Sequence, residues 1–567
     1  MLKKSFILSI ISAFVLTGCN FSIKNFFNKH SEQQINDDND NSGNATDENN
    51  DNDQEHDFKP DNGKFYGGLV KGEKYTGYEF SVSEKEIKKQ SQGTTEIKIY
   101  GFNDFHGSVT QNERESGLKL VGSFVKSVSN EENALVFDQG DTWQGSFESN
   151  YEYGKIVQDV FTEAQVSLRT IGNHDFDWGT ERLEKLCKVE EGKAYIPTLG
   201  ANIYDYKDGA TGTEQQVQYG KEYATFVLEN GLKVGVVGVI GSNQITTICS
   251  QLVESISFTN HIAKIKEISD FLRQDKQCDV VIASAHEGCD GCAYSGLTNI
   301  SGVSGKRYVD LVLNGHEHSK NEITENGVKF VQWDANGVTT GKVTLTYDFS
   351  TNKIVDNETK VNTYYEKYLK TYYPIDKKIN DMVDNYLEVV SKKGETVLSK
   401  NFVGEFSEDN LSNLMCEAIY SKAVSVGENI DFAVCNYPRD IFNKTEMKYS
   451  DLYKCFPFDN QIIIFEDTGY NLSSSISRNF HYRENISLNI YSSKTYRVAV
   501  IDYIALHQNS ERKYDYFPSI TNYIVLKNDD GSISNYREIL CDYFVSNPDK
   551  IFNNVDYNST AAHFSLY

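Results

Sequence analysis

Apolar and polar residues alternate through Glu96–Phe102, and this period of two predicts a β-strand. Apolar positions at helical spacing predict helices over residues 118–128 and 260–272. Further strands are predicted at residues 134–137, 166–171, 233–240, 280–285, 311–313 and 329–333. Because predicted strands and helices alternate, residues 96–362 are expected to form an α/β layered domain. In such a domain the functional site lies at the carboxyl ends of the strands.

A different pattern begins after residues 341–362. The Tyr- and Lys-rich stretch 364–393 predicts a linker helix, which we assign to residues 363–395. Residues 396–567 are expected to form a second α/β domain, with strands at 461–466, 497–501 and 523–527. The length of 567 residues agrees with two folded domains, since single cores rarely grow so large.

The N-terminus has the features of an export signal. Lys3 and Lys4 precede an apolar run over residues 6–16, which is well short of the ~20 residues that a membrane-spanning helix needs. The sequence Leu16-Thr17-Gly18-Cys19 then resembles a bacterial lipobox. That resemblance makes residues 1–19 a lipoprotein signal peptide and Cys19 the lipidated residue. We therefore expect a protein anchored by lipid to the extracellular face of the cell membrane.

Residues 20–95 are predicted to be an acidic disordered tether followed by an approach segment without a clear period. Residues 32–57 carry ten Asp and Glu and no Lys or Arg, which is typical of a solvated spacer. Calcium binding by this acidic run is the alternative. The net charge of -25 argues against binding to duplex nucleic acid, because phosphate contacts need clustered Lys and Arg.

Apart from Cys19, nine cysteines are present, so they cannot all pair within the chain. The pair Cys289-x-x-Cys292 favours a local disulfide or free thiols over structural zinc, because no second pair lies at zinc-finger spacing.

Polar residues follow the predicted strands in five short segments. These are Asp104-Phe105-His106, Gly140-Asp141, Thr170-Ile171-Gly172-Asn173-His174-Asp175-Phe176-Asp177, His286-Glu287-Gly288 and Gly315-His316-Glu317-His318. Five of the 11 histidines lie in these segments. Hydrolysis of a phosphate ester by two divalent ions requires such oxygen and imidazole ligands, with one carboxylate between the ions. Any one of these Asp or His residues, taken alone, could instead be a helix cap or a core histidine. The set as a whole predicts a two-metal hydrolase.

In order along the chain, these motifs resemble those of the calcineurin-like metallophosphoesterases. Within that group, Asn103-Asp104-Phe105-His106-Gly107 and Gly172-Asn173-His174-Asp175-Phe176-Asp177 resemble the secreted 5′-nucleotidase family. The resemblance is strong over residues 96–345. It implies a four-layer αββα sandwich with a second α/β C-terminal substrate domain. It also implies hydrolysis of nucleoside monophosphates to nucleoside and phosphate.

The resemblance assigns roles to the motif residues. Two divalent ions are implied, of Zn, Mn, Co or Fe. One would be held by Asp104, His106 and His318, and the other by Asn173, His286 and His316. Asp141 would bridge both ions. His174 and Asp177 would form a catalytic dyad that stabilises the transferred phosphoryl group and donates a proton to the leaving oxygen, while Asp175 has no assigned role.

The resemblance is weaker in the C-terminal domain. Phe458 and Tyr503 are expected to stack on the base, and Asn436 and Arg439 to contact the substrate. The glycines of the family loop are replaced around Tyr437-Pro438, which restricts the backbone. Glu405 stands where relatives carry Arg and is expected to repel phosphate. Asp515 is the candidate for the ribose-contacting carboxylate.

Three alternatives keep the same metal site but act on 2′,3′-cyclic nucleotides, nucleotide sugars or non-nucleotide phosphate esters. An alternative of another class is a non-catalytic surface binding lipoprotein. The sequence does not establish the oligomeric state.

Overall fold

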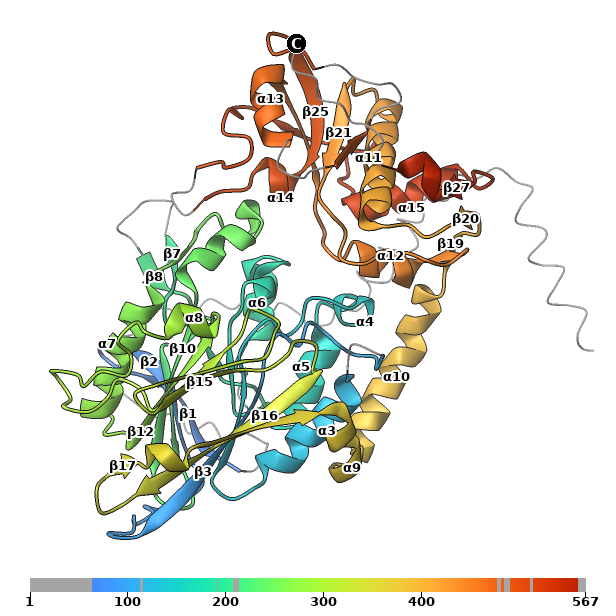
Figure 1. The fold of residues 1–567 in the computed structure, drawn as a ribbon. Coiled ribbons are helices and arrows are strands. Elements are labelled where there is room, and N and C mark those ends of the chain that lie inside the picture. The colour runs from blue at the N-terminus through green and yellow to red at the C-terminus, as the bar shows by residue number, and fades with distance from the viewer. Residues whose placement is uncertain are drawn as a thin grey trace, which may run out of the picture.

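The computed structural model describes residues 64–112, 116–190, 192–206, 214–476, 481–483, 490–509 and 513–558. They form two bodies, and the long helix α10 (Lys377–Gly394) runs along one side of the first and reaches the second (Figure 1). The predicted signal peptide, Cys19 and the acidic run 32–57 lie outside the described residues. Within those ranges, no helix is both long and apolar enough to cross a membrane.

The first body contains two large β-sheets. One has eight strands in the order β1-β2-β9-β10-β12-β13-β15-β14. The other has the order β17-β16-β3-β4-β5-β6, and β18 also pairs with β16. A small third sheet has the order β11-β7-β8. The bounds are β1 (Tyr66–Lys71), β2 (Thr76–Ser81), β3 (Thr94–Phe102), β4 (Ala134–Asp138), β5 (Leu168–Thr170), β6 (Thr198–Leu199), β7 (Ile203–Tyr206), β8 (Glu214–Gln216), β9 (Tyr223–Val227), β10 (Lys233–Ile240), β11 (Ile256–Phe258), β12 (Val280–His286), β13 (Leu311–Asn314), β14 (Asn321–Glu325), β15 (Val328–Gln332), β16 (Thr339–Asp348), β17 (Lys353–Ile354) and β18 (Lys360–Tyr365).

Apolar side chains pack the two large sheets face to face. Further apolar side chains pack helices against the outer face of each sheet. Strand β3 buries Ile97 and Ile99 in the core between the sheets, and Tyr100 and Phe102 in the core on its other face. That second core contains α3 (Leu118–Ser129) and α5 (Lys155–Glu163). Helix α7 (His261–Gln274) packs on the other sheet. The predicted four-layer αββα sandwich is therefore confirmed.

The central strands of both sheets are parallel. Strands β3, β4, β5 and β6 pair in parallel, as do β10, β12, β13 and β15. The ends of parallel strands meet at one edge of a sheet, so the polar segments after β3, β4, β5, β12 and β13 are brought together.

Two sequence predictions are wrong in detail. The approach segment 58–95 is not irregular throughout, because residues 66–81 supply β1 and β2, and β2 pairs in parallel with β9. The single linker helix is two helices, α9 (Glu366–Tyr372) and α10, preceded by β18. Pro374 lies between them, and proline restricts both its own backbone and that of the preceding residue.

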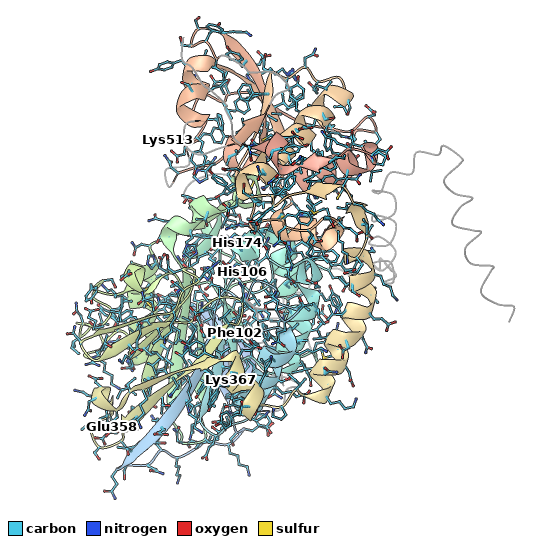
Figure 2. The ribbon with its side chains drawn as sticks, turned by 45° about the vertical axis from the view of Figure 1, so that its right-hand side comes forward. Phe102, His106, His174, Glu358, Lys367 and Lys513 are labelled. Carbon is cyan, nitrogen blue, oxygen red and sulfur yellow. The ribbon has the colours of Figure 1, made fainter. Side chains whose placement is uncertain are left out.

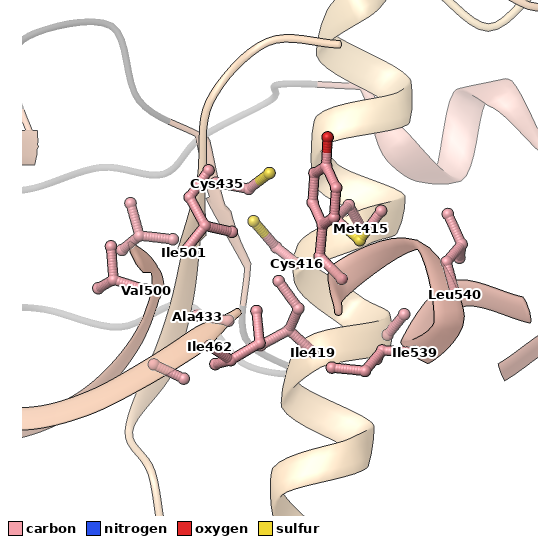
Figure 3. Close-up of a cluster of buried hydrophobic side chains, with 14 of the residues drawn as sticks. Met415, Cys416, Ile419, Ala433, Cys435, Ile462, Val500, Ile501, Ile539 and Leu540 are labelled. Carbon is pink, nitrogen blue, oxygen red and sulfur yellow. The ribbon is translucent and has the colours of Figure 1, made fainter. Parts of the chain in front are cut away.

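The second body is built around one mixed sheet of order β24-β21-β25-β23-β26. Helix α11 (Glu408–Ser425) packs on this sheet through Ile419 and Cys416, which Figure 3 shows beside Ala433 and Cys435 of β21. The predicted strand 523–527 is shorter, with only Ile524–Val525 in β26. The bounds are β19 (Val397–Ser399), β20 (Phe402–Val403), β21 (Phe432–Cys435), β22 (Met447–Lys448), β23 (Ile462–Thr468), β24 (His481–Arg483), β25 (Thr495–Ile501), β27 (Phe552–Asn553), α12 (Tyr449–Cys455), α13 (Gly469–Ile476), α14 (Asp502–Ala505) and α15 (Tyr536–Ser546).

The cysteines of the described ranges are all buried, and none of them forms a disulfide within those ranges. Cys289 and Cys292 form the two ends of the short helix α8 (Cys289–Cys292), so the structure has the free-thiol form of this pair.

Candidate active site

The predicted metal ligands converge at the end of the first body that faces the second. Figure 2 shows His106 and His174 there. Five of the seven predicted ligands have the left-handed backbone conformation, with φ between 49° and 82°, although none is glycine: Asp104, His106, Asp141, His316 and His318. Non-glycine residues rarely adopt this conformation, and such strain concentrates at functional sites.

The potential ligand atoms form two clusters that share Asp141. One contains atoms of Asp104, His106, Asp141 and His318, and the other atoms of Asp141, His286 and His316, each set lying within 4.8 Å. The Nε2 atoms of His106 and His318 are 2.9 Å apart, so both rings are aimed at one point.

Asn173 belongs to the second cluster. Its Oδ1 lies 3.1 Å from Nε2 of His286 and 3.0 Å from Nδ1 of His316. All seven predicted ligands are thus brought together, in the two groups that the family resemblance implied.

Backbone carbonyls orient two of the imidazoles. His106 Nδ1 lies 3.0 Å from the carbonyl oxygen of Gln144, and His286 Nδ1 lies 2.8 Å from that of Gln139. If Nδ1 donates its proton to the carbonyl, Nε2 keeps its lone pair for a cation. Burial lowers the pKa of His106 to about 3, and of His316 and His318 to about 4, which favours neutral rings at these three positions. At His286 burial is outweighed by the carboxylate of Asp141, which raises the pKa of the imidazole to about 10.

The donor set fits divalent cations. Asp141 Oδ2 is buried and accepts no hydrogen bond within the described part of the chain, but it lies 3.2 Å from His286 Nε2 and 3.8 Å from His106 Nε2. Burial opposes ionisation of Asp141, yet His286 and His174 hold the pKa of its carboxyl well below the usual range. A buried carboxylate needs a compensating positive charge, and a cation between the two clusters would supply it.

Two glycines allow the loops that carry the predicted ligands to approach closely. A Cβ at Gly172 would lie 2.2 Å from Oδ1 of Asp141. Gly140 has φ +94°, and a Cβ there would lie 2.7 Å from the backbone nitrogen of Gly172. The glycines before Asp141 and Asn173 are therefore required by this contact.

Asp175, to which the sequence assigned no role, ties these two loops together. Its carboxylate accepts backbone N–H bonds from Gly172 at 2.8 Å, Thr142 at 3.0 Å and Asp141 at 3.2 Å. The one sign of this role in the sequence was the place of Asp175 within the motif, because the hydrogen-bond partners of a carboxylate cannot be identified from a single segment.

The two side chains of the predicted catalytic dyad contact each other. His174 Nδ1 lies 2.8 Å from Asp177 Oδ2, and the backbone N–H of His174 donates to Asp141 Oδ1 at 2.8 Å. Burial lowers the pKa of His174, but the carboxylates of Asp177 and Asp141 outweigh it, and the net pKa is raised above 6.5. The imidazole is thereby kept protonated to higher pH, as a proton donor requires.

A cavity of about 630 Å³ lies between the two bodies and reaches the dyad. Four of the five predicted substrate-binding residues line it: Asn436, Arg439, Phe458 and Tyr503. The Phe458 ring is stacked on His174, with centroids 5.8 Å apart, and the Arg439 guanidinium lies 5.0 Å from the Phe458 ring centroid on the second body. The segment that carries Phe458 is held by Arg537, which donates to the carbonyls of Phe456 and Phe458, each at 2.8 Å.

Two other expectations are not met at this cavity. Asp515 is not among its lining residues, and its carboxylate instead lies 3.9 Å from His507 Nδ1. Glu405 is exposed and also absent from the lining, so its charge does not face the cavity. The loop around Tyr437-Pro438, despite its lost glycines, still places Asn436 and Arg439 in the lining.

The fold and the paired clusters agree with the class of protein that the sequence motifs predict. Residues 97–320 match the family model of the calcineurin-like phosphoesterases. This part of the chain is therefore similar to the calcineurin-like phosphoesterases, which agrees with a hydrolase of phosphate esters, and it carries the residues placed to bind divalent metal.

Its similarities point to 5′-nucleotidases and apyrases within this class. The chain is 24% identical to an apyrase of Tabanus yao over 423 residues, which are 66% of this chain and 72% of the apyrase. It is 26% identical to a 5′-nucleotidase of Diplobatis ommata over 234 residues, covering 40% of this chain and 38% of that protein. The structure of a 5′-nucleotidase precursor from Thermus thermophilus aligns with a TM-score of 0.62 at 16% identity, over 80% of this chain and 96% of that one. The two-body fold is thus shared with a solved 5′-nucleotidase.

Proposed function

We propose that the protein is an extracellular, lipid-anchored 5′-nucleotidase that uses two divalent metal ions to hydrolyse nucleoside monophosphates to nucleoside and phosphate. The observation that carries the proposal is that the His174–Asp177 dyad lines the same interdomain cavity as the aromatic residues of the second body, while His174 also contacts the paired ligand clusters through its backbone N–H bond to Asp141. The anchoring is supported by the lipobox-like sequence that ends at Cys19.

In this proposal Asp104, His106 and His318 would hold one ion, Asn173, His286 and His316 would hold the other, and Asp141, which belongs to both clusters, would contribute to both sites. The ions would be Zn, Mn, Co or Fe, since imidazole and carboxylate ligands suit these metals. When bound, they provide a nucleophile at neutral pH and offset the charge on the phosphoryl oxygens.

The chain's own residues position the substrate and move the proton. Arg439 supplies positive charge beside the phosphate, while Phe458 and Tyr503 hold the nucleoside by stacking. An oxygen from water forms the new bond to phosphorus as the bond to the 5′-oxygen breaks. Asp177 holds the Nδ1 proton of His174, so that Nε2 can donate its proton to the leaving 5′-oxygen.

Loss of base stacking is the test of the nucleotide assignment. Stacking of a base on an aromatic ring is worth about 1–3 kcal/mol, so Tyr503→Ala and Phe458→Ala should each lower kcat/KM for AMP by roughly tenfold or more relative to an aryl phosphate. Tyr523→Ala removes a tyrosine of the second body that does not line the cavity, and should leave this ratio unchanged. Equal losses for both substrates in all cavity variants would refute nucleoside binding at this wall.

The dyad predicts a defined change in pH dependence. In Asp177→Asn the negative charge that raises the pKa of His174 is lost, so the imidazole deprotonates at lower pH. The alkaline limb of the kcat/KM profile for AMP should therefore move to lower pH by on the order of one unit. Glu181→Gln, which removes an exposed carboxylate paired with Lys185, should leave the profile in place. An unmoved alkaline limb in Asp177→Asn would show that His174 is not the proton donor.

A further inference from the structure

A fully buried arginine lies in the strand that leads to the segment of the dyad. Arg169 is the middle residue of β5, and its exposed fraction is 0%. Its neighbour across the parallel pairing is Asp138, the last residue of β4, which is equally buried. Arg169 Nε donates to Asp138 Oδ2 at 2.8 Å, so the two side chains form a buried ion pair. The proposed reaction gives this pair no role.

Fold stability alone does not account for the pair. Taking two charges out of water is costly, and apolar residues of similar volume often leave a protein equally stable or more so. The Arg169 guanidinium lies 4.4 Å from the ring centroid of buried Trp143, and it donates to Gln158 Oε1 of α5 at 2.6 Å. An apolar side chain could pack on the same ring. It could not hold the carboxylate of Asp138, which is what sets the arginine apart.

The Asp138 carboxylate holds the residues on both sides of Asp141. Its Oδ1 accepts the backbone N–H of Gly140 at 3.2 Å, and its Oδ2 accepts the hydroxyl of Thr142 at 2.7 Å. Gly140 directly precedes Asp141, and Thr142 directly follows it. Because Asp141 itself has a left-handed backbone with φ 53°, its conformation depends on the contacts that fix its neighbours.

Asp141 needs this precision more than the other predicted ligands do. Its carboxylate belongs to both ligand clusters, so a shift of this segment would be felt at two sites at once. Asp175 holds the segment from the next loop, through the backbone N–H groups of Asp141 and Thr142. Asp138 holds it from the strand below. Without Arg169, the buried Asp138 carboxylate would lose its cationic partner and with it the reason to stay in this place.

We propose that Arg169 is a positioning residue for the two-metal site: through Asp138 it fixes the backbone on both sides of Asp141, so that one carboxylate serves both ions. This inference rests on the proposed function, because it concerns the metal site of that reaction. It does not depend on which phosphate ester is hydrolysed. Since Arg169 acts through other residues, its loss should change metal binding before it changes any step of the chemistry.

The test is the binding of Mn(II) to the metal-free protein, measured by equilibrium dialysis and by electron paramagnetic resonance. The second method detects the magnetic coupling between two Mn ions that share a ligand. We expect the wild type to bind two ions as a coupled pair. Arg169→Met should bind Mn at least about tenfold more weakly and lose most of the coupled signal. Arg169→Lys restores the charge beside Asp138 and should recover part of both.

Arg273→Met is the matched control, because it breaks a buried ion pair of the same body away from the ligand segments. Arg273 Nη2 lies 2.6 Å from Asp310 Oδ2, and its Nη1 donates to the carbonyl of Asp279. Asp279 directly precedes β12, whereas the predicted ligand His286 ends that strand. Both Met variants should lose thermal stability, since each leaves a buried carboxylate unpaired. Only Arg169→Met should lose Mn affinity and coupling.

Thr142→Val provides a second variant that leaves every charge in place. It removes only the hydroxyl that donates to Asp138, so it should lower Mn affinity in the same direction by a smaller factor. Wild-type affinity and coupling in Arg169→Met, or in Thr142→Val if Arg169→Met does not fold, would overturn the positioning role and leave the proposed function intact. An equal loss in Arg273→Met would also overturn it, because general destabilisation would then explain the result. If the wild type binds no pair of Mn ions, the proposed function itself fails.

Discussion

Replacing Asp141 with Ala should reduce kcat for AMP by at least about 1,000-fold. Loss of a residue that only hydrogen-bonds to a metal ligand already lowers metal affinity or activity by about 10- to 100-fold, and Asp141 is itself a proposed ligand. Asp141 is the one residue common to both ligand clusters, and its Oδ2 faces His106 and His286. Removing it leaves two incomplete sites, Asp104 with two histidines and Asn173 with two histidines, and no carboxylate common to both. Metal content by mass spectrometry should fall together with activity.

Controls separate this effect from unfolding. Asp141→Asn keeps the shape of the side chain and loses only its charge, so it should also lose metal while its thermal unfolding shows a folded protein. Asp159→Ala removes an exposed carboxylate that is paired with Lys155 on α5, and should be fully active. If Asp141→Ala kept its metal and stayed within tenfold of wild-type activity, the bridging role would be wrong.

Replacing His174 with Ala should lower kcat by about 10²- to 10⁴-fold, the usual contribution of a general acid. His174 belongs to neither ligand cluster, and its ring is engaged by Asp177 instead. Metal content should therefore stay at the wild-type value, in contrast to Asp141→Ala. The measurement is kcat for AMP together with metal per chain.

His261 provides the control variant. It lies at the start of α7, contacts Ser242 and belongs to neither ligand cluster. His261→Ala should leave both kcat and metal content unchanged. Loss of metal from His174→Ala would mean that His174 is a ligand, and the division of roles within the motif would have to be revised.

The convergence of the predicted ligands could be foreseen because these residues follow strands in a recognisable order. Asp104, Asp141 and His286 each end or follow a strand whose apolar run is clear, and parallel pairing then brings the ends together. The left-handed backbone at Asp104 and Asp141 was not predictable, because Asp tolerates this conformation better than most residues but adopts others more often. It is imposed by the contact between loops from different strands.

Other features depend on contacts distant in sequence. Strand β2 is short and contains Gly77, so its pattern is weak, yet it pairs with β9, which lies far along the chain. Arg537 gave no signal of its role until the fold placed it under Phe456 and Phe458. Asp515 was assigned from a segment whose family turn is missing, and it lies outside the cavity.

We propose, above all, that the protein is a metal-dependent enzyme that acts on nucleoside monophosphates. The most direct test of this proposal is phosphate release by the purified protein, stripped of metal and then resupplied with Mn, Zn, Co or Fe. The substrates compared are AMP, UDP-glucose, 2′,3′-cyclic AMP and an aryl phosphate. We predict that AMP is the best substrate and that activity saturates at two metal ions per chain. Turnover of the aryl phosphate alone, or of no substrate with both ions bound, would contradict it.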